Sequence, residues 1–330
     1  MINEKIEFGG TVSSLVFNDC SYSEPKLSIL IPTYNRSHLV KDAIDSALRQ
    51  CTKLDYEIVV IDNDSDMSHK NELIAYVRNL NCGRIRLFFN ENNVGMFGNW
   101  NLAIFLANAE NITILNDDDV LGPNFIMSIE NHFNFDGLII TSSHIFHDNQ
   151  DLLKIKFPEK ACSYKKLDFS DVIVGNPVRG SLGAVFNRQK AIDIGGYNPK
   201  CWPTSDYDFT FRYFMRHGAI ISKTVTSAYR WAENESLKVN TLNDFLKNDF
   251  LFRAKIIDDM PELKKKFFHA LEVYHMASMC SAYFKINPSF YIYETNEIPC
   301  VSVNKIKLMD FKLIRHAFNI IYKIMWKAFF

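Results

Sequence analysis

Apolar and polar residues form alternating blocks along the first 115 positions of the chain. Short runs rich in Ile, Leu and Val predict strands buried on both faces, which are typical of a parallel sheet. The expected strands cover 27–31, 56–66, 83–90 and 111–115. The segments between them carry apolar residues at helical spacing. The expected helices cover 37–50, 69–80 and 99–109. This alternation, with short connections, predicts a doubly wound α/β sheet.

Polar clusters end or directly follow three of the expected strands. They read "PTYNR" at 32–36, "DNDSD" at 62–66 and "NDDD" at 116–119. Ligands of doubly wound sheets bind beyond the carboxyl ends of the strands. We therefore expect the three clusters to converge on one crevice and to form a ligand site.

The acidic triplet Asp117, Asp118 and Asp119 closes the last of these strands. Adjacent carboxylates repel one another, and partial desolvation adds to the cost. One interpretation is a solvated turn with Gly122 and Pro123. The other is a site for Mg²⁺ or Mn²⁺, which bind one or two carboxylates together with substrate phosphates. A solvated turn needs no buried strand to present it at a crevice, so the pattern favours the metal site.

Composition narrows the class of protein. The chain has 330 residues, 47% of them apolar, so it can bury a large core. Its net charge of -1 gives no overall electrostatic field that would attract nucleic acid. Seven isolated cysteines argue against a disulfide framework or a zinc site and favour the cytoplasm. We see no signal-peptide pattern, no bilayer-spanning apolar run, and neither GxGxxG nor GxxxxGK[ST].

Taken in order, five segments resemble the first half of family 2 glycosyltransferases with the GT-A fold. They are "LSILIPTYNR", "IVVIDNDSD", "NVG", "NWNLAI" and "LNDDDVLGP". The resemblance implies an α/β fold in which a Rossmann-like mixed sheet is flanked by helices, and it extends over about residues 26–235. The expected parts are an N-terminal extension (1–25), a nucleotide-binding half (26–120), an acceptor half (121–235) and a helical C-terminal region (236–330).

The resemblance also implies a nucleoside-diphosphate sugar as donor and assigns residues to it. The expected donor-nucleotide residues are Pro32, Thr33, Asn35, Asp62, Asn63, Asp64, Asn101 and Asp117. Family members often carry Asp where this chain has Asn63. An amide both donates and accepts hydrogen bonds, so Asn63 can still recognise uracil. Asp118 is the expected metal ligand. Asp119 is either a second ligand or a residue that lies next to the ligand without binding the metal.

Residues 180–199 and 202–213 resemble the acceptor segment of the same family. Its acidic residue at a helix start corresponds to Asp206, the expected general base, with Asp208 as the fallback. The alternative role for Asp206 is a helix N-cap, which Ser205 could equally supply. Arg179 and Arg230 are candidates for phosphate contacts, against the alternative of ordinary surface ion pairs.

"HIFH" at 144–147 does not form a metal pair by its spacing, so we interpret both histidines as structural or facing solvent.

These parts imply an inverting glycosyltransferase. A carboxylate removes the proton of an acceptor hydroxyl, and a nucleoside diphosphate leaves without a second acid when a cation absorbs its charge. The expected donor is a UDP-sugar, and the expected acceptor is a growing, lipid-linked bacterial surface glycan of the O-antigen or capsule type. The two rivals are a catalytically silent binding module and a sugar nucleotidyltransferase. The latter usually needs a Gly-rich loop after the first strand, which "PTYNR" lacks.

The last stretch, 304–330, combines a cationic strip with a wide apolar surface. The strip consists of Lys312, His316, Asn319, Lys323 and Lys327. Such a helix suits the plane of an anionic membrane, which would place the protein peripherally on the inner face of the cytoplasmic membrane. Packing of the same helix on the core or on another subunit is an equal alternative.

Overall fold

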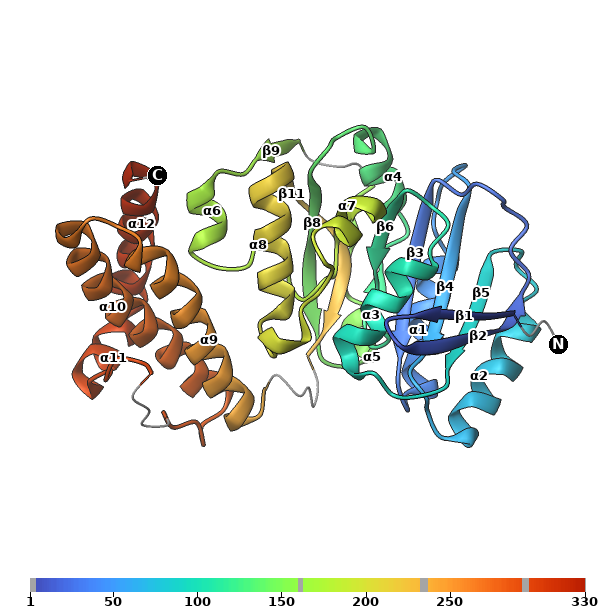
Figure 1. The fold of residues 1–330 in the computed structure, drawn as a ribbon, viewed down its shortest axis with the longest axis horizontal. Coiled ribbons are helices and arrows are strands. Elements are labelled where there is room, and N and C mark those ends of the chain that lie inside the picture. The colour runs from blue at the N-terminus through green and yellow to red at the C-terminus, as the bar shows by residue number, and fades with distance from the viewer. Residues whose placement is uncertain (1–3, 160–162, 232–236, 293–296, 330) are drawn as a thin grey trace. The chain divides into compact units, whose positions relative to one another are not determined.

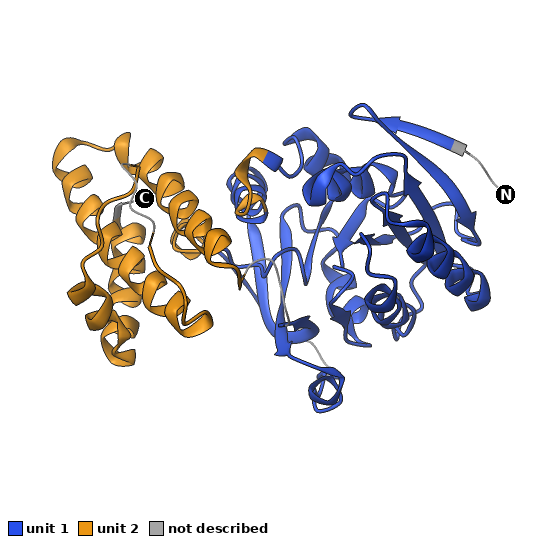
Figure 2. Cartoon of the chain, turned by 90° about the horizontal axis from the view of Figure 1, so that it is seen from below, with its two compact units in different colours: residues 1–167, 176–199, 206–232 blue, residues 168–175, 200–205, 233–330 orange. Residues whose placement is uncertain are grey.

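The computed structural model describes residues 4–159, 163–231, 237–292 and 297–329. The chain divides into two compact units, which Figure 2 colours separately. Unit 1 comprises 1–167, 176–199 and 206–232, and unit 2 comprises 168–175, 200–205 and 233–330.

Unit 1 is built on a mixed sheet of eleven described strands with helices packed on it (Figure 1). The strands are β1 (Glu4–Phe8), β2 (Thr11–Asn18), β3 (Leu27–Thr33), β4 (Tyr56–Asp62), β5 (Ile85–Asn90), β6 (Asn111–Ile114), β7 (Val120–Leu121), β8 (Leu138–Phe146), β9 (Tyr164–Lys166), β10 (Ala184–Asn187) and β11 (Ala219–Arg230). Their order is β1-β2-β5-β4-β3-β6-β10-β8-β11-β7, and β9 pairs with β11. The predicted mixed α/β sheet is confirmed.

The helices of unit 1 lie on both faces of this sheet. They are α1 (Ser37–Leu48), α2 (Met67–Leu80), α3 (Gly95–Leu106), α4 (Phe125–Ile129), α5 (Asn149–Leu152), α7 (Arg188–Asp193) and α8 (Ser205–His217). Ile29 and Ile31 of β3 pack with Val40 and Ile44 of α1. Every residue of β3 and of β4 is buried, because neighbouring strands and helices cover both strands on all sides.

β3 runs two residues further than the apolar run predicts and includes Pro32. Its register with β4 continues through Pro32↔Ile61 and Thr33↔Asp62. Pairing with β6 on the other side ends at Leu30↔Ile114, so the missing N–H of Pro32 costs no ladder hydrogen bond.

Residues 4–18, which lie in the expected N-terminal extension, add two strands to the edge of the sheet. β1 and β2 form a hairpin, and β2 pairs antiparallel with β5. The two-residue turn consists of Gly9 and Gly10, with φ of 60° and 81°, a conformation that favours glycine.

Unit 2 is helical. Its helices are α6 (Phe169–Ile173), α9 (Val239–Asp258), α10 (Glu262–Ile286), α11 (Val303–Asp310) and α12 (Lys312–Phe329). The core of α9 and α10 includes Leu246, Met276 and Cys280. The tail expected as one helical stretch is two helices, because Phe311 is extended and ends α11. Among the described helices, none combines the length and the apolar character needed to cross a bilayer.

Candidate active site

The structure brings the three polar clusters together at the carboxyl ends of β3, β4 and β6. The Thr33 hydroxyl donates to Oδ2 of Asp117 at 2.8 Å. The backbone N–H of Asn63 donates to the carbonyl oxygen of Thr33 at 2.9 Å. One residue from each cluster therefore belongs to a single hydrogen-bonded group, as the layout of the sheet requires.

Arg36 bridges two carboxylates of the acidic triplet. Its Nη1 lies 3.2 Å from Oδ1 of Asp117 and 3.1 Å from Oδ2 of Asp118. Burial raises the pKa of Asp117 to about 6, and the Arg36 guanidinium opposes this effect. Burial likewise raises the pKa of Asp118. Arg36 lies within "PTYNR", but the local pattern assigns it no role, because its pairing with the acidic triplet spans more than 80 residues.

Asp119 is fully buried, and both of its carboxylate oxygens accept hydrogen bonds from the protein. Oδ2 accepts from the Asn116 amide at 2.8 Å, and Oδ1 accepts from the backbone N–H of Arg230 at 2.8 Å. Burial, followed by the neighbouring Asp118, raises the pKa of Asp119. Two roles are expected for Asp119, a second metal ligand or a residue that lies next to the ligand. These contacts favour the second role, because the carboxylate fixes the acidic turn against β11.

The donor set around Asp118 suits a hard divalent cation. Among the described residues, no three His, Cys, Asp or Glu side chains gather into a metal cluster. The site instead offers the partly exposed carboxylate of Asp118 beside that of Asp117. Mg²⁺ and Mn²⁺ take one or two protein carboxylates when phosphates complete the shell, so the residues present fit such an ion.

The loops after β3 and β4 are tied to each other. The backbone N–H of Asn35 donates to Oγ of Ser65, and Oδ1 of Asn35 accepts from the backbone N–H of Asp66, each at 2.8 Å. Asn35 (φ 53°) and Asp64 (φ 64°) are left-handed, a conformation that Asn and Asp tolerate. Burial raises the pKa of Asp62, whose Oδ1 accepts from the N–H of Ser65.

Asn63 and Asp64 differ in what they contact. The Asn63 amide donates to Asn93 and to the Gly95 carbonyl, and it accepts from Asn90 and from the Val94 N–H. It thus holds the "NVG" loop with its donor and acceptor atoms. The carboxylate of Asp64 is partly exposed and pairs with Lys70 at 2.7 Å.

Asn101 lies against the Gly195–Tyr197 turn. Its Nδ2 donates to the Tyr197 carbonyl and its Oδ1 accepts from the Tyr197 N–H, both at 2.8 Å. A Cβ on Gly196 would lie 2.4 Å from Oδ1 of Asn101. The structure therefore gives Asn101 a positioning role at this turn.

Asp206 occupies the first turn of α8. Burial raises the pKa of Asp206 to about 7, although N–H groups of the helix start and the Asn176 amide favour its charged form. Nδ2 of Asn176 donates to Oδ2 of Asp206 at 3.0 Å. A carboxylate with a pKa near neutral pH suits a general base.

Asp208 is committed to an ion pair instead. Its Oδ2 accepts from Nε and Nη2 of Arg212 at 2.8 and 2.7 Å. The same guanidinium donates to the carbonyl oxygens of Ile194 and Gly196, so Asp208 anchors the turn that precedes α8.

The segment 176–180 links Asp206 to the acidic triplet. Asn176 at its start binds Asp206, and at its other end a Cβ on Gly180 would lie 3.8 Å from Nδ2 of Asn116. The same Asn116 nitrogen donates to Asp119. Four residues span at most about 14 Å, so base and triplet lie in one region of unit 1. Sequence reasoning missed Asn176, since nothing in its local pattern marks it.

The two expected phosphate contacts have different surroundings. Arg179 is exposed, and its guanidinium lies over the Tyr229 ring, 5.6 Å from the centroid. Arg230 is buried and donates to the Asp118 carbonyl oxygen, to Asn149 and to Asp42. Arg179 is therefore the better placed of the two for a ligand.

The two histidines of "HIFH", His144 and His147, are both exposed. Nδ1 of His147 lies 3.0 Å from the Trp231 carbonyl oxygen.

The family profile described as Glycosyl transferase family 2 matches residues 28–217, which is more than half of the chain. The chain belongs to this family. The match contains both the acidic triplet and Asp206. It also accounts for the order of segments from which the resemblance was drawn.

Individual relatives match parts of the chain. A GalNAc(5)-diNAcBac-PP-undecaprenol beta-1,3-glucosyltransferase of Campylobacter jejuni is 41% identical over 100 residues, which cover 29% of this chain and 31% of the relative. The matched region of the first curated relative, an uncharacterized glycosyltransferase of Rickettsia conorii, is 27% identical and covers 36% of that protein. The chain thus spans about a third of the length of these relatives.

Solved structures share the GT-A fold. The mannosyltransferase PcManGT from Pyrobaculum calidifontis, in complex with GDP-Man and Mn²⁺, has a TM-score of 0.55 at 15% identity, covering 94% of this chain and 88% of that one. S. aureus TarS 1–349, in complex with UDP-GlcNAc, has a TM-score of 0.54 at 18% identity, covering 79% and 73%.

Proposed function

We propose that unit 1 catalyses inverting transfer of a sugar from a nucleoside-diphosphate donor, UDP-linked by preference, to an acceptor hydroxyl. The observation that carries the proposal is a carboxylate with a pKa near neutral pH, Asp206, which the segment 176–180 connects to the carboxylate triplet. Family membership supports the same chemistry.

The base step assigns a role to Asp206. The carboxylate takes the proton of the acceptor hydroxyl while the acceptor oxygen bonds to the anomeric carbon of the donor sugar. The bond from that carbon to the diphosphate breaks on the opposite face, so the configuration inverts and the nucleoside diphosphate leaves. One carboxylic acid suffices, because the diphosphate needs no proton to depart.

The acidic triplet, on the other side of the site, would hold the cation that offsets the charge on the departing diphosphate. Asp118 would hold a divalent cation, with Asp117 beside it and Asp119 fixing the turn. When bound, the cation offsets the charge that develops on the diphosphate oxygens. Arg179 supplies a further positive charge, because its guanidinium is exposed beside Tyr229.

We propose a growing, lipid-linked surface glycan as the acceptor. The supporting observation is the printed activity of the Campylobacter relative, which acts on an undecaprenol-linked glycan. A cytoplasmic location accompanies this proposal. The described cysteines, Cys20, Cys51, Cys82, Cys201, Cys280 and Cys300, are free, as is usual in a reducing compartment.

A thermal-shift screen tests the proposal. Nucleoside diphosphates and their sugars are each added with and without Mn²⁺, and the unfolding midpoint is recorded. We expect UDP and a UDP-sugar to raise the midpoint more with Mn²⁺ than without it. A screen in which no diphosphate raises the midpoint, with or without metal, would refute the proposed donor class.

The same screen separates the rivals. A sugar nucleotidyltransferase would respond to a nucleoside triphosphate more strongly than to a diphosphate. A silent binding module would show the diphosphate response yet release no UDP from a UDP-sugar under any condition. Asp206, with its raised pKa, favours the transferase over the silent module, because a binding module needs no base.

A further inference from the structure

Helix α12 leaves an apolar face exposed. Leu313 is 83% and Ile324 is 56% exposed, and Ile320 lies between them at helical spacing. The opposite face carries Tyr322 and Trp326, which are buried in unit 2. α12 is therefore anchored by one face, while its other face presents contiguous aliphatic side chains to the surroundings.

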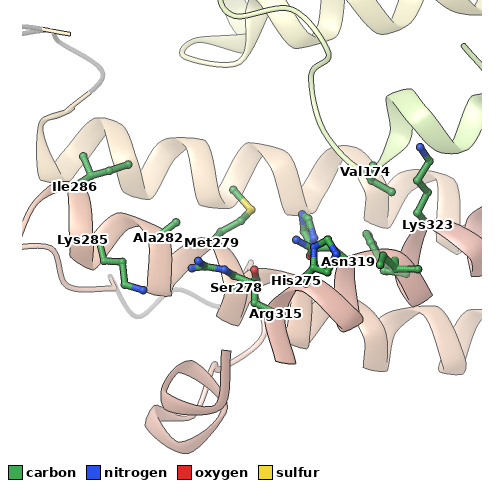
Figure 3. Close-up of a pocket in the computed structure, with 13 residues that line it drawn as sticks. Val174, His275, Ser278, Met279, Ala282, Lys285, Ile286, Arg315, Asn319 and Lys323 are labelled. Atoms are coloured by element: carbon green, nitrogen blue, oxygen red, sulfur yellow. The ribbon is translucent and has the colours of Figure 1, made fainter. Parts of the chain in front are cut away.

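A pocket of about 730 Å³ in unit 2 adjoins this face. Figure 3 shows its lining side chains, most of which come from α10 and α12. Met279, Ala282 and Ile286 give the pocket an apolar lining, and Arg315 and His316 add positive or ionisable groups. Ile320 belongs to both the pocket and the exposed face, so the two surfaces are continuous.

The cations of this region differ in how far they are neutralised. Lys285 pairs with Asp310 at 2.6 Å, Lys327 pairs with Asp168 at 2.8 Å, and Lys323 pairs with Asp171. Arg315 and His316 form no ion pair with any described residue; Arg315 only helps Lys285 to lower the pKa of Asp310. Both groups line the pocket, which is continuous with the apolar face through Ile320, and remain available to an anion.

We propose that unit 2 binds the surface of an anionic membrane, with the exposed face of α12 among the acyl chains and a lipid phosphate at Arg315 and His316. An apolar helix face flanked by cations lies in the interfacial plane of anionic bilayers. Residues 303–330 contain six Lys and Arg residues but Asp310 as their sole acid, although the whole chain has a net charge of -1. A second copy would bring the same cations together, so charge favours the membrane. The proposal does not rest on the transferase activity.

Vesicle flotation of the full chain tests the apolar contact. We expect binding to phosphatidylcholine vesicles that contain phosphatidylglycerol, and weak binding to phosphatidylcholine alone. Leu313→Ser should weaken binding about tenfold, because an apolar side chain is lost from the acyl region. Leu263→Ser is the matched control, since Leu263 is 85% exposed on α10 and outside the proposed surface; it should bind like the wild type.

A second pair of variants tests the headgroup contact. Arg315→Gln should weaken binding to phosphatidylglycerol vesicles about fivefold, whereas Lys255→Gln on α9 should leave it unchanged. Inorganic phosphate should not release the bound protein; release by low phosphate would show a free-phosphate site and overturn the proposal. Equal binding to both kinds of vesicle would also overturn it.

A self-association surface would give a different result. In that case Leu313→Ser would turn a dimer into a monomer on gel filtration without changing flotation, and the membrane proposal would be wrong. The thermal shift by UDP, measured on the same samples, should be unchanged in all four variants. Loss of flotation with an intact UDP response therefore separates this surface from the proposed activity.

Discussion

At the scale of single residues, the environment assigns different roles to two acids of one helix turn. Burial raises the pKa of Asp206 to about 7, and its hydrogen-bond partner is the neutral amide of Asn176. Asp208, two positions later, pairs with the cationic side chain of Arg212, and this pair anchors the turn before α8. The family resemblance ranked Asp206 before Asp208, whereas spacing alone could not, because the contact of Asp206 with Asn176 spans 30 residues.

Asp206→Asn should abolish transfer and preserve nucleotide binding. The amide cannot take the acceptor proton, and we expect a rate loss of about 10²- to 10⁴-fold. The measurement pairs a transfer assay with UDP binding by calorimetry. Asp208→Asn is the control: it should lower the unfolding midpoint by loss of the Arg212 pair and keep most of the transfer rate. The base role would pass to Asp208 if the two variants exchanged these behaviours.

The pH dependence of transfer tests the environment of the same carboxylate. A base must be deprotonated to act, so the rate should rise with pH through an apparent pKa of about 7. Asn176→Ala removes a donor that stabilises the charged form, so the pKa of Asp206 should increase and the rising limb should move to higher pH. A limb that stays in place, or moves to lower pH, would contradict the assignment of Asn176.

At the scale of elements, the turn before α8 is held by long-range contacts. Tyr197 follows two glycines with positive φ, and its ring stacks on Phe209 of α8 with centroids 4.1 Å apart. The side-chain amide of Asn101 in α3 forms two hydrogen bonds with the backbone of this turn. The turn therefore connects a helix of the nucleotide half with the helix that carries the base.

Gly196→Ala should destabilise the protein more than Gly195→Ala. Both positions have positive φ, which costs a side chain about 1–2 kcal/mol. Only at Gly196 would the new Cβ lie 2.4 Å from Asn101; no atom lies within 4 Å of such a Cβ at Gly195. Urea unfolding measures both free energies, and Asn101→Ala should reduce the difference between them. Equal costs for both substitutions would show that the Asn101 contact is not tight.

The elements also show what the sequence could predict. Apolar runs located β3, β4, β5 and β6, because strands buried on both faces have little choice of residue. The β1–β2 hairpin has a local signal, since Gly9-Gly10 separates two alternating segments, but it was not among the expected elements. Arg36 and Asn176 had no such signal, because an isolated polar residue does not reveal its distant partner.

At the scale of the whole molecule, the two units have separate cores of different kinds. Unit 2 encloses an ionic network in which the fully buried Arg253 binds Asp249 and, at 2.9 Å, Glu272. Although burial opposes it, the charges of Arg253 and His275 hold the pKa of Asp249 below its usual range. This contribution to stability is present above the unfolded pKa of an Asp, near 4, and is lost as the pH falls below it.

Arg253→Met should destabilise unit 2 by about 3–5 kcal/mol, because two buried carboxylates lose their cation. Urea unfolding followed by fluorescence measures the loss, with Lys265→Met at the partly exposed Asp258 pair as a near-neutral control. At low urea, UDP binding should persist in the Arg253 variant, since the network lies outside unit 1. A variant as stable as the wild type would show that the network contributes little to folding.

The central claim is that a cation held at Asp118 and a nucleoside diphosphate occupy the carboxyl end of the sheet in unit 1. Calorimetric titration of UDP, with and without Mn²⁺, into the wild type and Asp118→Asn tests it most directly. We predict that Mn²⁺ tightens UDP binding at least tenfold in the wild type and has little effect in the variant. If Mn²⁺ tightened UDP binding equally in both proteins, or UDP bound to neither, the account would be contradicted.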